Sequence, residues 1–185
     1  VSGSPAGGWP SVGLVAATDV GDAQNGGNPQ FESIFSWVRA TDGKVKAFGG
    51  TTSASYGTSF SDGDIFNMAV DIDNGKCWWG KNNTYFNSGN PATGTNAGQT
   101  FTAGTDMSLY MTSYVGAAKL IINSGQDSNF SGEKSTGTNS AADGNGYGDF
   151  YYAPPSGFLS LNSANLPTST DIDPTETDDD IPTKQ

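Results

Sequence analysis

The residues of this sequence that could do chemistry gather in one short stretch, where Asp71 and Asp73 precede two adjacent tryptophans. Hydrolysis of a glycosidic bond needs two carboxyl groups that flank the bond. Asp71 and Asp73 have the alternate spacing that places two acids on one face of a strand. The glutamates stand far apart in the chain, at Glu32, Glu133 and Glu176, and no Glu-x-Asp-x-Glu pattern occurs. Because Asp73 is followed by Asn-Gly, a hairpin turn explains this stretch better than a catalytic pair.

The segment Asp71-Ile-Asp-Asn-Gly75 also carries side-chain oxygens at short spacing, which raises a calcium interpretation. The calcium loop of an EF-hand needs a glutamate at its twelfth position. Counted from Asp71, that position is Asn82, and the earlier spacing is one residue short. The spacing of the other loop carboxylates indicates no metal site; these residues are Asp19, Asp22, Asp62 and Asp64. We therefore expect a tight turn here, no metal ion and no other cofactor.

The composition excludes several classes of function. The chain of 185 residues contains no histidine and one cysteine, so it cannot build a Ser-His-Asp triad, a His-ligated metal site or an internal disulfide. Its 8 basic and 19 acidic residues give a net charge of −11, which opposes binding to nucleic acid. No apolar run approaches the roughly 18 residues of a membrane span, so we expect no membrane insertion.

Short apolar runs separated by turn-forming residues predict an all-β domain. The expected strands cover 11–17, 31–39, 45–48, 64–72, 76–81, 107–114, 117–123 and 150–152. The strongest local signal is Asn74-Gly75, because both central residues of a type I′ hairpin turn need a positive φ. No segment keeps a 3.6-residue apolar period, so the sequence predicts an antiparallel sandwich or barrel.

Composition also divides the chain into three parts. Residues 1–10 read as a flexible lead-in and residues 11–167 as the folded domain, which includes a low-complexity insertion at 132–148. Residues 168–185 combine acidic side chains with Pro and Thr and contain almost nothing to bury. We expect this last part to be a disordered acidic linker or tail.

Two stretches of the folded domain carry a recognisable pattern. One is the hairpin Ala69-Val-Asp-Ile-Asp-Asn-Gly75, whose return strand ends in Trp79-Gly-Lys-Asn82. The other is Tyr152-Ala-Pro-Pro-Ser-Gly-Phe158, near the end of the domain. Together they resemble the SPRY family, in the form found in structural proteins of bacteriophages and marine viruses. The likeness covers roughly residues 11–167, and Asn83 stands where that family usually has glycine.

The resemblance implies a two-sheet, concanavalin-like antiparallel β-sandwich that binds partners through loops at one end and has no catalytic residues. It also implies an opening strand before Ser11, so we expect the chain to be a piece of a longer protein. In the register of the family, Cys77 and Trp79 point into the core and Trp78 points outward. Cys77 would then be a small buried hydrophobic residue rather than a nucleophile.

Aromatic side chains supply the candidate ligand-binding residues, which are Trp78, Tyr85, Phe86 and Tyr56. Aromatic rings stack on the apolar faces of sugars and anchor protein interfaces. Trp78 is the first candidate, and its ring lies either beneath a loop or exposed on the surface. Tyr85 and Phe86 follow the hairpin and could line the same surface, and Tyr56 stands in or near a loop.

These observations favour a non-enzymatic binding or scaffolding module of a virion structural protein, in a tail, a fibre or a capsid-associated protein. Its partners would be a host surface glycan, other virion proteins or other copies of itself, and its location would be the virion. Two alternatives stay open. One is an intracellular SPRY adaptor that binds a short peptide, which the acidic, lysine-poor composition disfavours. The other is a concanavalin-like carbohydrate-active enzyme that uses Asp71 or Asp73.

Overall fold

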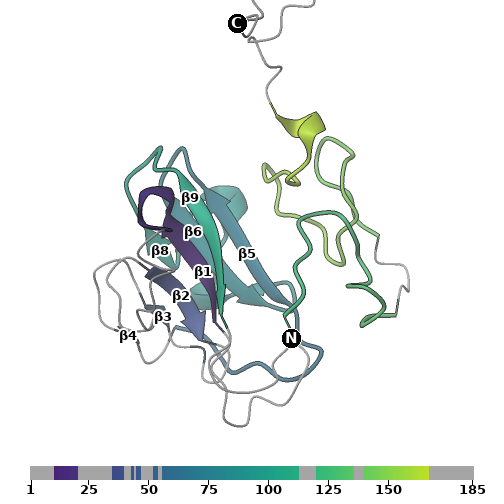
Figure 1. Cartoon of the computed structure of the whole chain (residues 1–185), viewed down its shortest axis with the longest axis horizontal. Helices are drawn as coiled ribbons and strands as arrows, with labels where there is room; N and C mark the ends of the chain where they lie inside the picture. The colour runs from purple at the N-terminus through teal and green to yellow at the C-terminus, as the bar shows by residue number, and fades with distance from the viewer. Residues whose placement is uncertain are drawn as a thin grey trace, which may run out of the picture.

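The computed structural model describes residues 11–20, 35–39, 43, 45–46, 52–53, 56–112, 120–135 and 140–166. The expected lead-in at 1–10 and acidic tail at 168–185 lie outside these residues. The described elements are nine β-strands and four short 3₁₀ helices, which confirms the expected all-β class (Figure 1). The 3₁₀ helices are η1 (Ala17–Asp19), η2 (Phe86–Ser88), η3 (Pro91–Thr93) and η4 (Ser163–Asn165).

The first sheet has five antiparallel strands in the order β4-β3-β2-β1-β9. The strands are β1 (Ser11–Ala16), β2 (Phe35–Arg39), β3 (Val45–Lys46), β4 (Thr52–Ser53) and β9 (Met107–Thr112). Apart from β4, each of them falls within a strand that the sequence predicts. β1 lies between β2 and β9, so that Leu14 is opposite Ser36 on one side and Leu109 on the other.

The second sheet is built around β6. It contains β5 (Phe66–Asp71), β6 (Lys76–Lys81), β7 (Thr84–Tyr85) and β8 (Gln99–Thr100), all antiparallel to their neighbours. β5 pairs with the whole of β6, from Asp71 opposite Lys76 to Phe66 opposite Lys81. β7 and β8 share the other edge of β6. The predicted hairpin of residues 64–81 is therefore confirmed.

Side chains of both sheets meet in one hydrophobic core. Its buried members are Leu14 of β1, Cys77 and Trp79 of β6, and Phe60. Partly buried side chains from both sheets pack against them (Met107 of β9; Phe66, Met68 and Val70 of β5; and Tyr56, Phe86 and Phe101). Full burial of one large apolar side chain stabilises a fold by roughly 1.5–3 kcal/mol. The inward orientation expected for Cys77 and Trp79 is confirmed, since both belong to this core cluster.

The hairpin turn differs from the expected type I′ turn at Asn74-Gly75. The connection between β5 and β6 is a four-residue loop, 72–75, closed by a bond from Gly75 N to Ile72 O of 3.2 Å. Gly75 has a positive φ of 60°, but Asn74 does not. The reason is Asp71, whose carboxylate accepts the backbone N–H of Asn74 and so fixes a wider turn. The type I′ prediction is therefore wrong at this position.

A type I′ turn does occur one connection later, between β6 and β7. Its two central residues are Asn82 and Asn83, with φ values of 49° and 67°. The flanking residues Lys81 and Thr84 pair directly, so the loop contains two residues only. Asn tolerates the left-handed region better than other non-glycine residues, so two asparagines can occupy the centre of this turn.

The described residues from 120 to 166 are mostly irregular and lie beside the sheets (Figure 1). The strands expected at 117–123 and 150–152 are absent from their described parts, and Phe150 forms only an isolated bridge to Ala141. Asp143, which the sequence places in an insertion, is buried here. It accepts bonds from Tyr147 N, Ser160 N and Asn165 Nδ2 at 3.0, 2.8 and 2.7 Å. Side-chain hydrogen bonds therefore replace strand pairing in this part of the chain.

Candidate functional site

The two faces of β6 have different roles. Successive side chains of a strand point to opposite faces. Cys77 and Trp79 face the hydrophobic core, whereas Lys76 and Trp78 face the other side of the second sheet. Burial raises the pKa of the Cys77 thiol, so this cysteine remains protonated and unreactive.

Trp78, the first candidate for ligand binding, is fully buried on this outer face. Its indole Nε1 donates a hydrogen bond of 2.8 Å to Thr95 O. Its ring meets the Phe158 ring edge-on, with the centroids 6.0 Å apart and the planes at 88°. Of the two predicted placements, the one beneath a loop is therefore the one observed. The Trp78 ring offers no free surface to a ligand.

Tyr56 and Phe86 do not belong to this outer face. Both pack against the hydrophobic core, and the Tyr56 ring centroid lies 5.7 Å from those of Trp79 and Phe86. Burial raises the pKa of Tyr56 to about 12. The expectation that Phe86 lines the same surface as Trp78 is wrong, because Phe86 follows the outward-facing Tyr85 and points into the core.

Tyr85 is the remaining predicted site residue, and it lies in β7 opposite Gly80 of β6. Directly opposed residues in a sheet share a face, so Tyr85 is on the same face as Trp78. Burial raises the pKa of the half-buried Tyr85 to about 12. The four predicted aromatic residues thus divide between the core and the outer face, and they form no common open site.

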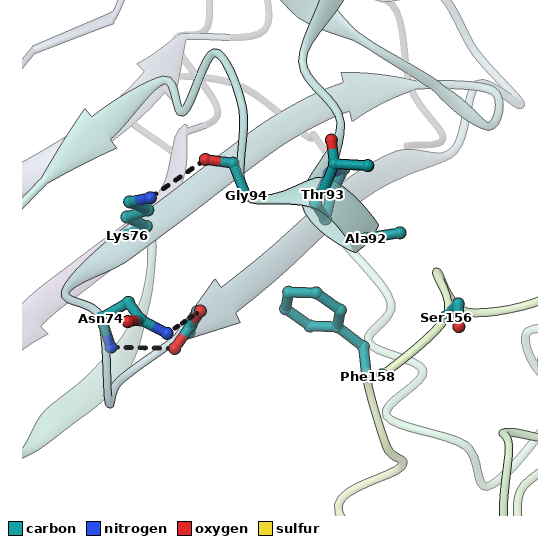
Figure 2. A pocket seen from close by; sticks show the side chains of 10 residues that line it. Asn74, Lys76, Ala92, Thr93, Gly94, Ser156 and Phe158 are labelled. Carbon is teal, nitrogen blue, oxygen red and sulfur yellow. Dashed lines mark hydrogen bonds between the residues drawn. The ribbon is translucent and has the colours of Figure 1, made fainter.

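An open pocket of about 410 Å³ lies on the outer face, beside Trp78. Three segments line it (Figure 2). The first is the end of the β5–β6 hairpin, with Asp71, Asn74 and Lys76. The second is the η3 turn from Pro91 to Gly94, and the third is Ser156, Gly157 and Phe158. Figure 2 shows the Phe158 ring between the Asn74 turn and the segment that carries Ala92.

The hairpin wall of the pocket is polar. Asp71 Oδ1 accepts the backbone N–H of Asn74 at 2.9 Å, and Asp71 Oδ2 accepts Asn74 Nδ2 at 2.8 Å. Lys76 Nζ donates to Gly94 O at 3.0 Å, which ties the hairpin wall to the η3 wall. Asp71 therefore serves the turn, and Asp73 beside it is exposed.

The η3 wall is held rigidly at both ends. Asn90 and Thr95 exchange two backbone hydrogen bonds of 3.0 and 3.1 Å, and Asn90 Oδ1 accepts the N–H of Thr93. Pro91 begins the turn, and Gly94 ends it with a φ of 70°. Asn before Pro, with Gly three residues later, is a recognisable start-and-stop signal for a short helix. This signal could have predicted the position of the η3 turn from the sequence.

The third wall comes from the Pro-Pro-Ser-Gly-Phe motif. Phe158 N donates to Pro155 O at 3.0 Å, and Gly157 has a φ of 86°. Gly at the third position of such a turn is typical of type II. The turn directs Phe158 against Trp78 and leaves part of the ring at the pocket. Phe158 lines the pocket but is absent from the candidates predicted from the sequence, although the Pro-Pro-Ser-Gly-Phe motif that contains it is distinctive.

Some chemistry can be judged from the described part of the chain alone. Within it, no three His, Cys, Asp or Glu side chains come close enough together to hold a metal ion. Among the same residues, no helix has the length and apolar character needed to cross a membrane.

Comparison of the chain with protein-family models, with curated proteins and with solved structures found no match. The SPRY resemblance therefore stays a prediction that depends on the two motifs themselves. The pocket has to be interpreted from its own geometry.

Proposed function

We propose that this chain is a non-enzymatic binding module of a virion structural protein and that its outer-face pocket binds a carbohydrate of the host surface. The observation that carries this proposal is the position of the Phe158 ring beside the Asp71–Asn74 turn. A sugar has apolar C–H faces that pack on an aromatic ring and hydroxyl groups that need hydrogen-bond partners. The pocket offers both within one hollow.

The polar groups around the ring suit hydroxyl recognition. Asp71 accepts one N–H on each carboxylate oxygen, and a carboxylate has further acceptor capacity. Asn74 and Ser156 add an amide and a hydroxyl group to the wall. The pocket is open rather than enclosed, which suits one unit of a longer glycan better than a small molecule that must be engulfed.

A binding role is favoured over hydrolysis for a specific reason. Retaining and inverting glycosidases both need two carboxyl groups that face the substrate, about 5–9.5 Å apart. Asp71 is the one acidic residue that lines the pocket in the part of the chain described. We therefore propose that Asp71 orients the turn and the sugar, with no part in bond cleavage.

The fold that we propose is the two-sheet, concanavalin-like sandwich. Two antiparallel sheets whose side chains meet in one core support it. The virion assignment is supported by the Tyr152–Phe158 motif and by a composition rich in glycine and poor in charge, with 26 glycines and 15% charged residues. Mass spectrometry of purified particles should detect this chain. Its absence from the particles would contradict the assignment.

The binding proposal is tested by screening the purified chain on a broad glycan array. Three variants make the screen specific. Phe158→Ala removes the stacking ring, and Ala92→Trp fills the pocket from an exposed position of its wall. Leu161→Ala is the control, because Leu161 is 83% exposed and lies outside the pocket. Saturable binding that Phe158→Ala weakens, Ala92→Trp abolishes and the control keeps would support the proposal. The proposal would be overturned if the folded chain bound no glycan on the array.

A further inference from the structure

The charges at the base of the pocket are not paired in the usual way. Asp71 and Lys76 are directly opposite each other in the β5–β6 register. Opposite charges in this position commonly attract each other across the strands. Here they form no ion pair, because Asp71 binds Asn74 with both oxygens and Lys76 Nζ donates to Gly94 O.

The other lysine of β6 provides an internal comparison. Lys81 Nζ lies 2.6 Å from Asp64 Oδ2 and also donates to Ser59 O. The charge of Lys81 is thus neutralised within the fold. Lys76 is half-buried at the wall of the pocket, and its one hydrogen bond within the described residues goes to a neutral carbonyl. Since an ammonium group has three N–H donors, Lys76 keeps donor capacity toward the pocket.

We propose that the pocket selects an acidic saccharide, of the uronic acid class, whose carboxylate pairs with Lys76. This inference rests on the proposed carbohydrate function and names its ligand class. The sugar carboxylate accepts from Lys76 Nζ, the hydroxyl groups bind the Asp71–Asn74 turn, and the apolar face packs on Phe158. Each Asp71 oxygen accepts an N–H of Asn74, and these N–H dipoles partly offset the negative charge of Asp71 at the pocket.

The test compares an oligoglucuronate with the same oligosaccharide after reduction of its carboxyl groups to hydroxymethyl groups. The two probes differ in charge and share their ring and hydroxyl pattern. Titration calorimetry with the folded chain should give tighter binding of the acidic probe, by about tenfold, as expected for one charged hydrogen bond. The third probe is an oligosaccharide that carries sulfate groups and no carboxylate. It distinguishes recognition of a carboxylate from recognition of any anion.

Variants connect the preference to Lys76. Lys76→Gln should remove the tenfold preference, because it removes the ammonium group that pairs with the sugar carboxylate. Lys134→Gln is the matched control, because it removes the same charge from a lysine that lies over the Tyr151 ring and outside the pocket. The preference of the native chain should also weaken as salt is raised from about 0.01 to 0.15 M, since ions screen the attraction.

Three results would overturn the inference. Equal binding of the acidic and reduced probes would contradict the selection of acidic sugars while leaving the carbohydrate function intact. A preference that survives Lys76→Gln would mean that the sugar carboxylate binds at another position. Tighter binding of the sulfated probe would mean that the pocket prefers a sulfate to a carboxylate. Failure of every probe, together with an empty glycan array, would overturn the proposed function as well.

Discussion

The ring of Phe158 covers the ring of Trp78 edge-on, with 6.0 Å between the centroids, although the two residues are far apart in the sequence. This contact joins the irregular part of the chain to the outer face of the second sheet. Phe158 also lines the pocket, whereas Trp78 is fully buried. We therefore expect the stability of the fold and the proposed ligand binding to depend on the same aromatic residue.

Phe158→Ala should expose Trp78. We expect a loss of about 2 kcal/mol in the free energy of unfolding, less than the 3–5 kcal/mol of a fully buried Phe because Phe158 is only partly buried. The tryptophan emission should also shift to the red. Urea unfolding followed by fluorescence measures both effects. Leu161→Ala should change neither, and an unshifted emission spectrum for Phe158→Ala would contradict the observed burial.

Gly75→Ala should disrupt the β5–β6 hairpin. Gly75 has a φ of 60°, and a Cβ there would collide with the carbonyl oxygen of Phe101. Gly104 has a similar φ of 73° but nothing within 4 Å of the Cβ position. Both alanine variants carry about 1 kcal/mol of backbone strain, and only Gly75→Ala adds the clash. Thermal unfolding should rank Gly75→Ala well below Gly104→Ala, and equal losses would be inconsistent with the packing of Phe101.

The two asparagines of the β6–β7 turn should respond differently to glycine. The Asn82 side chain accepts from Ile65 N at 2.9 Å and donates to Asp64 Oδ1 at 2.7 Å. Asn82→Gly should therefore cost about 1–2 kcal/mol. Within the described part of the chain, Asn83 forms its hydrogen bond through the backbone N–H, to Asn67 Oδ1, and glycine retains that group. Asn83→Gly should be neutral or slightly stabilising, because glycine adopts a positive φ without strain. Equilibrium unfolding of the two variants side by side checks this order of their free energies of unfolding. The order is the one that a type I′ turn at Asn82 and Asn83 requires.

Asp64 should contribute stability that is lost in acid. Partial burial opposes its charge, but the bonds from Lys81, Ser61 and Asn82 outweigh burial and lower the pKa of the Asp64 carboxyl. The unfolded carboxyl titrates near about 3.9. A folded pKa below that value means that the stabilisation is complete above about pH 5 and disappears as the pH falls through the folded pKa.

Asp64→Asn measures this contribution. At pH 7 the variant should be about 1 kcal/mol less stable than the native chain, because it loses the charge of a partly buried ion pair whose carboxylate also accepts hydrogen bonds from Ser61 and Asn82. As the pH falls from about 5 through the folded pKa of Asp64 the gap should close, because the protonated carboxyl is then as neutral as the asparagine amide. Asp73→Asn, at an exposed turn position, serves as the control. A gap that stays constant with pH would mean that the Asp64 carboxylate does not stabilise the fold through its charge.

Sequence patterns predicted the parts of the fold that depend on local periodicity. The alternation in Lys76–Lys81 places Cys77 and Trp79 inward, and the paired apolar runs define the β5–β6 hairpin. The type of its turn was missed because a side chain, Asp71, overrides the Asn-Gly preference. The two-residue strands β4, β7 and β8 carry no apolar pattern that periodicity can detect.

The candidate site was less predictable than the fold. The sequence directed attention to the correct face through Trp78, but that ring is covered by Phe158, a contact that no local pattern encodes. The pocket walls come from three separate segments, two of them turns. The inward position of Phe86 continues the strand alternation, because Phe86 directly follows Tyr85, which lies on the outer face.

The most direct test of the account is the affinity of the chain for the tightest glycan on the array, measured for the native chain, Phe158→Ala, Ala92→Trp and Leu161→Ala. We expect Phe158→Ala to weaken binding about tenfold, Ala92→Trp to abolish it and Leu161→Ala to leave it unchanged. If a glycan binds and neither pocket variant changes its affinity, the outer-face pocket is not the binding site and the central claim is wrong.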